Sequence, residues 1–81
     1  MIKRYRKKST IIEAVQWTGD NYDEIQDFVD GECCLAIGGF LYIETLEGVE
    51  EVRKGDYIIK DIENEFYLCK EGIFNRTYEE V

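Results

Sequence analysis

The chain contains no proline and no histidine, only three cysteines, and no long apolar run. The lack of histidine removes the base that most often activates a serine or cysteine nucleophile. No segment approaches the roughly 20 consecutive apolar residues that a membrane-spanning helix requires. The basic stretch 1–8 is not followed by the apolar segment and cleavage site of a secretory signal. We therefore expect a soluble, intracellular protein that does not contact a membrane.

The three cysteines predict neither a disulfide nor a zinc site. Cys33 and Cys34 are adjacent, so a bond between them would be strained, and Cys69 stands alone in the sequence. The chain has no C-x-x-C pair, and histidine ligands are missing. We expect three reduced, half-buried thiols, with no metal and no cofactor.

Charge is distributed unevenly along the chain. The 81 residues include 18 Asp and Glu against 10 Lys and Arg, a net charge of −8. Five of the basic residues lie within the first eight positions, so the rest of the chain has 18 acidic and five basic residues, a net charge of −13. Such a body repels nucleic-acid phosphates and suits a basic protein surface, including one that normally binds nucleic acid. Simple solubility is the alternative explanation, and the basic N-terminal segment leaves weak nucleic-acid binding open.

Length and composition indicate a single small domain over residues 1–81, with residues 1–9 as a basic N-terminal arm or edge segment. Hydrophobic residues make up 44% of the chain and aromatic residues 14%, which favours a folded globule over a disordered tail. The β-branched residues of 9–17 predict a strand, in which Ile11, Val15 and Trp17 share one face. Further strands are predicted at 32–37, 40–46, 49–53, 57–60 and 65–69, followed by a helical turn at 70–76 and an edge strand at 77–81.

One amphipathic helix is predicted at residues 21–30. Asp20 suits its N-cap, and Gly31 suits the position just after its end. The apolar residues of this segment recur at helical spacing and form one stripe: Tyr22, Ile25, Phe28 and Val29. The opposite side is acidic and should face water: Asp23, Glu24, Asp27 and Asp30. The fold class is therefore α+β, with this helix packed on a curled, mostly antiparallel sheet of five to six strands, a partial barrel.

Two turns follow from glycine-containing dipeptides. A two-residue turn at Glu47-Gly48 would place Ile43 opposite Val52, and Glu44 opposite Glu51. Arg53 would then relieve the repulsion between those two carboxylates. In the second turn, at 54–56, Asp56 is expected to accept hydrogen bonds from nearby main-chain N–H groups. Ile73 and Phe74 of the following helical turn are expected to point inward.

The aromatic residues allow two interpretations. Trp17 at a strand end and Tyr57 after the second turn would form an exposed rim that stacks on a base or fills a partner's pocket. Ordinary core packing is the alternative. Carboxylate pairs such as Glu44 with Glu51, or Asp56 with Glu65, would be needed for acid–base catalysis, but any strongly acidic chain provides such pairs by chance.

Six segments spread over nearly the whole chain form a pattern: R-Y-R-K-K (4–8), E-A-V-Q-W-T-G-D (13–20), L-E-G (46–48), G-D-Y-I-I-K (55–60), E-F-Y-L-C-K (65–70) and I-F-N-R-T-Y-E-E-V (73–81). This pattern resembles the small phage and prophage proteins called PGDYG proteins. Lys54 stands where the family name has proline, so the turn is less pre-set. The resemblance implies a gene of a tailed phage or of a prophage in a Gram-positive host, and the host cytoplasm as the location. It implies no reaction.

We expect a non-enzymatic phage accessory protein that binds a basic surface of a host protein and interferes with host defence or DNA metabolism. A protein that sequesters a nucleotide signal, and a structural or assembly protein of the virion, are the alternatives, and a homodimer stays open. The candidate binding residues are Trp17, Asp20, Asp23, Glu24, Asp27, Glu44, Glu51, Arg53, Lys54, Asp56 and Tyr57. For the nucleotide alternative, Lys60 and Arg76 are further candidates.

Overall fold

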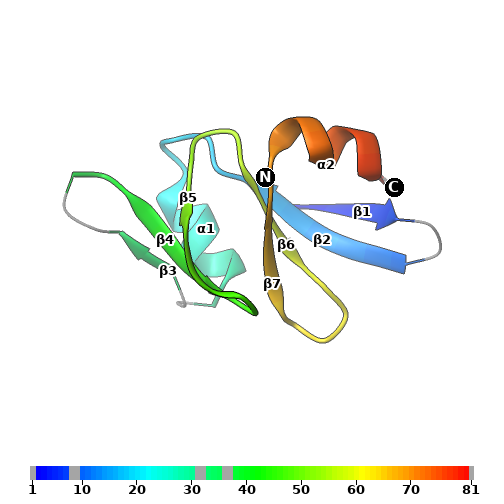
Figure 1. Ribbon diagram of the computed structural model, residues 1–81, viewed down its shortest axis with the longest axis horizontal. Coiled ribbons are helices and arrows are strands. Elements are labelled where there is room, and N and C mark those ends of the chain that lie inside the picture. Colours follow the sequence, from blue (N-terminus) through cyan, green and yellow to red (C-terminus); the bar gives the residue numbers. More distant parts are fainter. Residues whose placement is uncertain (1, 8–9, 31–32, 36–37, 81) are drawn as a thin grey trace.

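The computed structural model describes residues 2–7, 10–30, 33–35 and 38–80. They form an elongated α+β domain with extents of 39 × 23 × 21 Å (Figure 1). Its elements, in chain order, are β1 (Lys3–Lys7), β2 (Thr10–Gln16), α1 (Tyr22–Phe28), β3 (Cys33–Leu35), β4 (Leu41–Thr45), β5 (Gly48–Val52), β6 (Tyr57–Lys60), β7 (Phe66–Cys69), α2 (Glu71–Thr77) and β8 (Glu79–Glu80).

The strands form two antiparallel sheets. The larger sheet has five strands in the order β7-β6-β2-β1-β8, and the smaller has three in the order β3-β4-β5. The predicted α+β class is confirmed. The prediction of a single sheet of five to six strands with one helix is wrong in detail, because the structure has a second sheet and a second helix.

The large sheet is covered on both faces. On one face Val15, Trp17 and Ile58 are buried beneath α1 and the small sheet. On the other face Ile12 and Ala14 are buried beneath α2. This double burial explains why β2 has adjacent apolar residues, Ile11-Ile12 and Ala14-Val15, instead of a strict alternation. Val15 and Trp17 share a face as predicted, but Ile11, at the start of the strand, is exposed.

Helix α1 buries the predicted stripe. Ile25, Phe28 and Val29 are at most 3% exposed, and Tyr22 packs against the same core. The predicted N-cap is wrong, because Asn21 and not Asp20 is the residue that precedes the first helical turn. Gly31, the predicted stop residue, lies outside the described part of the chain, as do the ends of the strand predicted at 32–37.

Helix α2 confirms the helical turn predicted at 70–76, within one residue at each end, and closes the second core. Phe74 is 1% exposed, and its ring stacks on Tyr57 at a centroid distance of 3.8 Å and an interplanar angle of 3°. Tyr5 meets Phe74 edge-on at 4.7 Å. Burial, more than any neighbouring charge, raises the pKa of the Tyr5 phenol. Ile73 was predicted to point inward but is half exposed, because adjacent helical residues point about 100° apart and Phe74 takes the inward position.

The basic N-terminal residues are part of the large sheet. β1 pairs with β2 along its whole length, and the short β8 pairs with its other side at Tyr5 and Arg6. Lys3 Nζ lies 3.2 Å from a carboxylate oxygen of Glu80. The edge strand predicted at 77–81 is present as β8, although it is shorter than predicted.

The β4–β5 hairpin has a different register from the predicted one. Its two-residue turn is Leu46-Glu47, so that Thr45 pairs with Gly48 and Leu41 pairs with Val52. The predicted turn at Glu47-Gly48 was wrong by one residue, and each predicted pairing was therefore wrong by two. Gly48 adopts a φ of +112°, a conformation that L side chains rarely adopt, which makes this position a glycine position.

Candidate functional site

The most distinctive feature of the surface is an acidic lobe at one end of the domain. We define the acidic lobe as residues 17–52, which contain α1 and the small sheet and form one end of the molecule in Figure 1. This stretch has ten Asp and Glu residues and no Lys or Arg. Nine of the ten lie in the described part of the chain: Asp20, Asp23, Glu24, Asp27, Asp30, Glu44, Glu47, Glu50 and Glu51.

Helix α1 contributes exposed carboxylates because its apolar stripe is turned inward. Asp20, Asp23 and Asp27 are all exposed, together with Asp30 just after the helix. Asn21 fixes how the chain enters the helix. Its side-chain oxygen accepts a hydrogen bond from the N–H of Thr18 at 2.9 Å. The carboxylates of α1 are thus held on a well-anchored helix and not on a loose loop.

The pKa of Glu24, in the first turn of α1, is lowered by its hydrogen bonds. Hydrogen bonds from the chain's amino terminus and from Asn21 hold the pKa of Glu24 below its usual range, and its partial burial acts in the opposite direction. The Asn21 amide donates to Oε1 of Glu24 at 2.8 Å. Glu24 therefore stays ionised, but part of its charge is compensated within the molecule.

The small sheet continues the acidic surface. Glu44 faces Val49, and Glu51 faces Tyr42, so that Glu44 and Glu51 lie on one face of the sheet without opposing each other directly. Glu47 is exposed in the turn. Glu50 lies on the other face, where its carboxylate accepts a hydrogen bond from the Thr45 hydroxyl at 2.8 Å.

All ten basic residues lie outside residues 17–52, and two of them are paired away from the acidic lobe. Lys3 pairs with Glu80, and Lys70 lies 3.3 Å from Asp56. Three cations, Arg53, Lys54 and Lys60, reach the border of the lobe. Arg53 Nε is 3.6 Å from Glu51, and Lys60 Nζ lies 5.0 Å from the centroid of the Phe28 ring.

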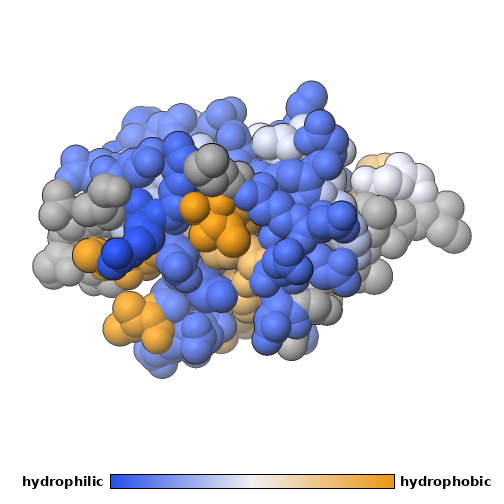
Figure 2. Space-filling view, turned by 180° about the vertical axis from the view of Figure 1, so that it is seen from behind, coloured by the Kyte–Doolittle hydropathy of each residue, from blue (hydrophilic) through white to orange (hydrophobic). Residues whose placement is uncertain are grey.

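The separation of charge is effective because the domain is elongated. Its longest extent is 39 Å, whereas the Debye length at physiological ionic strength is about 8 Å. A partner at the acidic end is therefore screened from the cations of the β1–β8 end. Figure 2 shows a mainly hydrophilic surface from behind, interrupted by a few apolar patches.

Trp17 and Tyr57 do not form the predicted aromatic rim. Trp17 is 7% exposed in the core beneath α1, whereas Tyr57 stacks on Phe74 in the core beneath α2. The pairing of Gln16 with Tyr57 puts Trp17 and Tyr57 on opposite faces of the large sheet. The alternative interpretation, core packing, is the correct one for both residues.

Asp56 also drops out of the candidate surface, because it is 4% exposed. Its Oδ2 accepts a hydrogen bond from the N–H of Arg53 at 2.9 Å, and Lys70 Nζ lies 3.3 Å from both carboxylate oxygens. The expectation that Asp56 accepts a main-chain hydrogen bond in its turn is confirmed. Glu65 lies at the far end of the β6–β7 hairpin, so the Asp56–Glu65 pair does not form.

Arg53 and Lys54 lie in the exposed turn that connects the two sheets. The aliphatic part of the Lys54 side chain lies beside Gly19. The two cations are therefore at the boundary of the acidic lobe and do not surround an exposed aromatic ring, as a nucleotide site would require.

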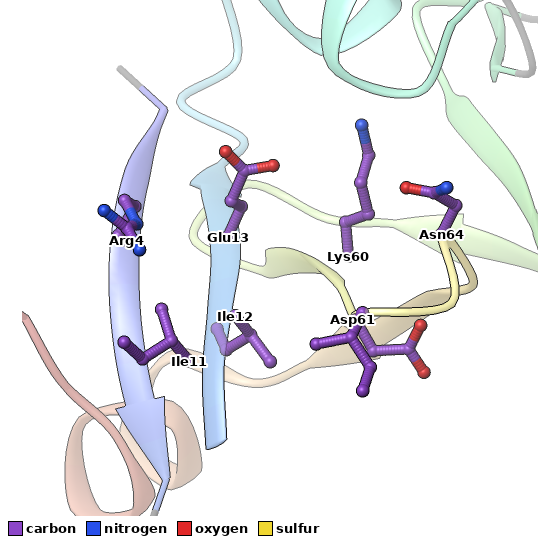
Figure 3. A pocket seen from close by; sticks show the side chains of 8 residues that line it. Arg4, Ile11, Ile12, Glu13, Lys60, Asp61 and Asn64 are labelled. Atoms are coloured by element: carbon purple, nitrogen blue, oxygen red, sulfur yellow. The ribbon is translucent and has the colours of Figure 1, made fainter. Parts of the chain in front are cut away.

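A groove of about 650 Å³ lies beside β1, β2 and β6 and the turn that follows β6 (Figure 3). Arg4, Glu13 and Lys60 come from three neighbouring strands and lie side by side, with Glu13 in the middle. Its other lining residues are Ile11, Ile12, Asp61, Ile62 and Asn64. The carboxylate between the two cations weakens attraction for an anion, and no aromatic residue lines the groove.

The described residues contain no group of three or more Cys, Asp or Glu side chains that could hold a metal ion. Within the same residues, no helix has the length and apolar character needed to span a bilayer. No family model, curated protein or solved structure matches the chain. Function has to be argued from the geometry of this molecule.

The sequence prediction found most carboxylates of the acidic lobe but missed Glu47, Glu50 and the anchoring role of Asn21. A usable signal was present, because residues 9–52 contain no lysine or arginine at all. The sequence does not show where these carboxylates lie. In the fold, α1 and the small sheet lie at one end of the molecule, apart from the cationic strand β1 (Figure 1).

Proposed function

We propose that this protein is a non-enzymatic phage accessory protein that binds a basic surface of a host protein through its acidic lobe. Interference with host defence or with DNA metabolism is the use that fits such an activity. The observation that carries the proposal is the acidic lobe itself, with ten carboxylates and no cation in residues 17–52. A basic surface that normally binds nucleic acid is the complementary partner, because it already attracts closely spaced negative charges.

The energetics favour a partner that covers several carboxylates at once. A single exposed ion pair is worth about 0–1 kcal/mol. Asp23 and Asp27 on α1, with Asp20 just before it, provide several exposed carboxylates. Glu44 of β4 and Glu47 of the β4–β5 turn add two more, so many such pairs can form in one interface. Complementary charge mainly raises the association rate and the specificity, and it makes binding sensitive to salt.

The small-ligand alternative is less well supported by the geometry. Trp17 and Tyr57, the aromatic residues that it needs, are packed into the two cores. The resemblance to phage proteins adds the host cell as the setting, and no observation favours a place in the virion.

The experiment is a pulldown from lysate of the bacterial host with a matched pair of variants. The lobe variant carries Asp20→Asn, Asp23→Asn and Asp27→Asn, all of which are exposed. The control variant carries Glu63→Gln, Glu71→Gln and Glu79→Gln, which remove the same charge from exposed positions outside the acidic lobe. We expect the wild type and the control to retain a specific partner that the lobe variant loses and that salt elutes. The absence of a salt-sensitive partner, or equal retention by both variants, would contradict the proposal.

A further inference from the structure

Strand β5 forms an open edge inside the acidic lobe. It is the last strand of the small sheet, with β4 as its hydrogen-bonded neighbour. Among the residues that the structure describes, no main-chain hydrogen bond joins the other side of β5 to another element. Val49 in this strand is 69% exposed. Such an edge presents unpaired N–H and C=O groups to solvent and is a template for an added strand.

The register of the hairpin identifies these unpaired groups. Thr45 and Gly48 flank the two-residue turn and pair with each other, and Ile43 pairs with Glu50. Hydrogen-bonded and non-hydrogen-bonded pairs alternate along an antiparallel ladder. The pair beside a two-residue turn is hydrogen-bonded. The N–H and C=O groups of Val49 and Glu51 therefore point away from β4.

We propose that β5 binds an extended basic segment of the partner protein as an added antiparallel or parallel strand. This inference rests on the proposed function and specifies how the acidic lobe engages its partner. Main-chain hydrogen bonds to Val49 and Glu51 supply the docking geometry, as in other cases of β-strand addition. Side chains alternate along the added strand, so cations at every second position lie on the face that carries Glu44 and Glu51.

A second copy of this chain is a poor occupant of the same edge. With Val49 opposite Glu51 of the second copy, the two Glu50 side chains oppose each other. With the two Val49 residues opposed, Glu51 faces Glu47, and with the two Glu51 residues opposed, these carboxylates meet directly. Each of these three antiparallel registers, which use the unpaired groups of Val49 and Glu51, places like charges across the junction, which is destabilising. The carboxylates thus disfavour pairing with β5 of a second copy, and they attract a strand that carries lysine or arginine.

The test uses three short synthetic peptides and the whole protein. The first peptide alternates lysine and valine. The second has the same side chains, but its main chain is N-methylated at alternate residues, so that it keeps the charge and loses the donors. The third replaces lysine with glutamate. Affinity is measured by fluorescence anisotropy, and the amide exchange rates of Val49 and Glu51 are measured by NMR.

We expect the first peptide to bind, the second to bind about tenfold more weakly or worse, and the third not to bind. We also expect slower exchange of the Val49 and Glu51 amides in the first complex. In the Val49→Pro variant the ring replaces an N–H that points to solvent, so the bonds to β4 remain while affinity for the first peptide falls. If that variant does not fold, the peptide pair on the wild type decides the matter.

Equal affinity for the first two peptides, with no protection of Val49 and Glu51, would overturn strand addition and leave the charge-based proposal standing. If no peptide binds but retention of the lysate partner still depends on the acidic lobe, strand addition would likewise be overturned and the charge-based proposal would stand. Concentration-dependent protection of both amides in the free protein would show that a second copy occupies the edge, and would overturn the inference. If the lobe variant retained the lysate partner as well as the wild type does, the proposed function itself would be contradicted.

Discussion

At the scale of single residues, Asp56 connects the two halves of the fold. It lies in the turn between β5 and β6, where the chain passes from the small sheet to the large one. Its buried carboxylate accepts the Arg53 N–H and lies within 3.3 Å of Lys70 Nζ, at the start of α2. The main-chain oxygen of Asp56 accepts the Trp17 N–H at 2.9 Å. One residue thus joins the turn, the end of β7 and the residue that follows β2.

We predict that Asp56→Ala lowers the free energy of unfolding by about 2 kcal/mol, because it leaves the N–H of Arg53 without its acceptor and removes a buried side chain. Asp56→Asn should cost less, since its side-chain oxygen still accepts that hydrogen bond. Lys70→Met should cost at most about 1 kcal/mol, because the Lys70 side chain is 64% exposed and the ion pair is partly screened. Urea unfolding of the three variants gives the order. Equal losses for Asp56→Ala and Lys70→Met would show that the ion pair, and not the turn, is the important contact.

At the scale of elements, two glycines differ in what their conformation requires. Gly48, at the start of β5, has a φ of +112°, whereas Gly72 lies within α2 and is not among the glycines with positive φ. A Cβ at either position would meet no atom within 4 Å. Only the backbone conformation separates the two cases.

We predict that Gly48→Ala destabilises the protein by about 1–3 kcal/mol through backbone strain. Gly72→Ala should stabilise it by about 0.5–1 kcal/mol, because alanine favours the helical conformation. Thermal or urea unfolding measures both changes. A neutral Gly48→Ala would mean that the hairpin can adopt another turn, and the register that exposes Val49 and Glu51 would then be in doubt.

The elements could be predicted from the sequence where one local rule applied. The helix stripe of Ile25 and Phe28 follows from helical spacing, and it is confirmed. The turn of the β4–β5 hairpin was predicted one residue late. Gly48 is compatible with both possibilities, as the second residue of a Glu47-Gly48 turn or as the residue just after a Leu46-Glu47 turn. The pairing of Leu41 with Val52 in the core decides between them. Asp20 and Asn21 are equally good capping residues by type, and Asn21 is the N-cap because its main-chain oxygen accepts the hydrogen bond from the Ile25 N–H.

Strand β1 shows the limit of local rules. A run of lysine and arginine has little tendency to form a strand by itself. It becomes one because β8 brings Glu80 within reach of Lys3, and β2 places Glu13 opposite Arg4. These partners are 77 and nine positions away along the chain. The acidic lobe was similarly foreseen as a surplus of charge, but its position at one end depends on which strands the cations join.

At the scale of the whole molecule, the separation of charge has a cost in the free protein. Asp23 and Asp27 are four residues apart on α1, so their carboxylates are neighbours on the helix surface. Like charges at this spacing destabilise a helix by about 0.2–0.5 kcal/mol. Asp27 also lies in the last turn, where the helix dipole disfavours negative charge. A basic partner would remove this repulsion, so the feature that weakens the isolated domain strengthens the complex.

We predict that Asp27→Asn raises the free energy of unfolding by about 0.5 kcal/mol at low salt. The gain should disappear near 1 M salt, where the Debye length falls to about 3 Å. The wild type should itself become more stable as salt increases. The measurement is urea unfolding over a salt series.

Glu80→Gln is the matched control, because Glu80 pairs with Lys3 at the opposite end of the domain. Its neutralisation should leave stability unchanged or lower it slightly at low salt, with the opposite salt dependence to Asp27→Asn. If both substitutions had the same effect, the protein would be responding to its net charge of −8 as a whole. The electrostatic repulsion would then not be concentrated in the acidic lobe, and the basis for its recognition by a basic partner would be lost.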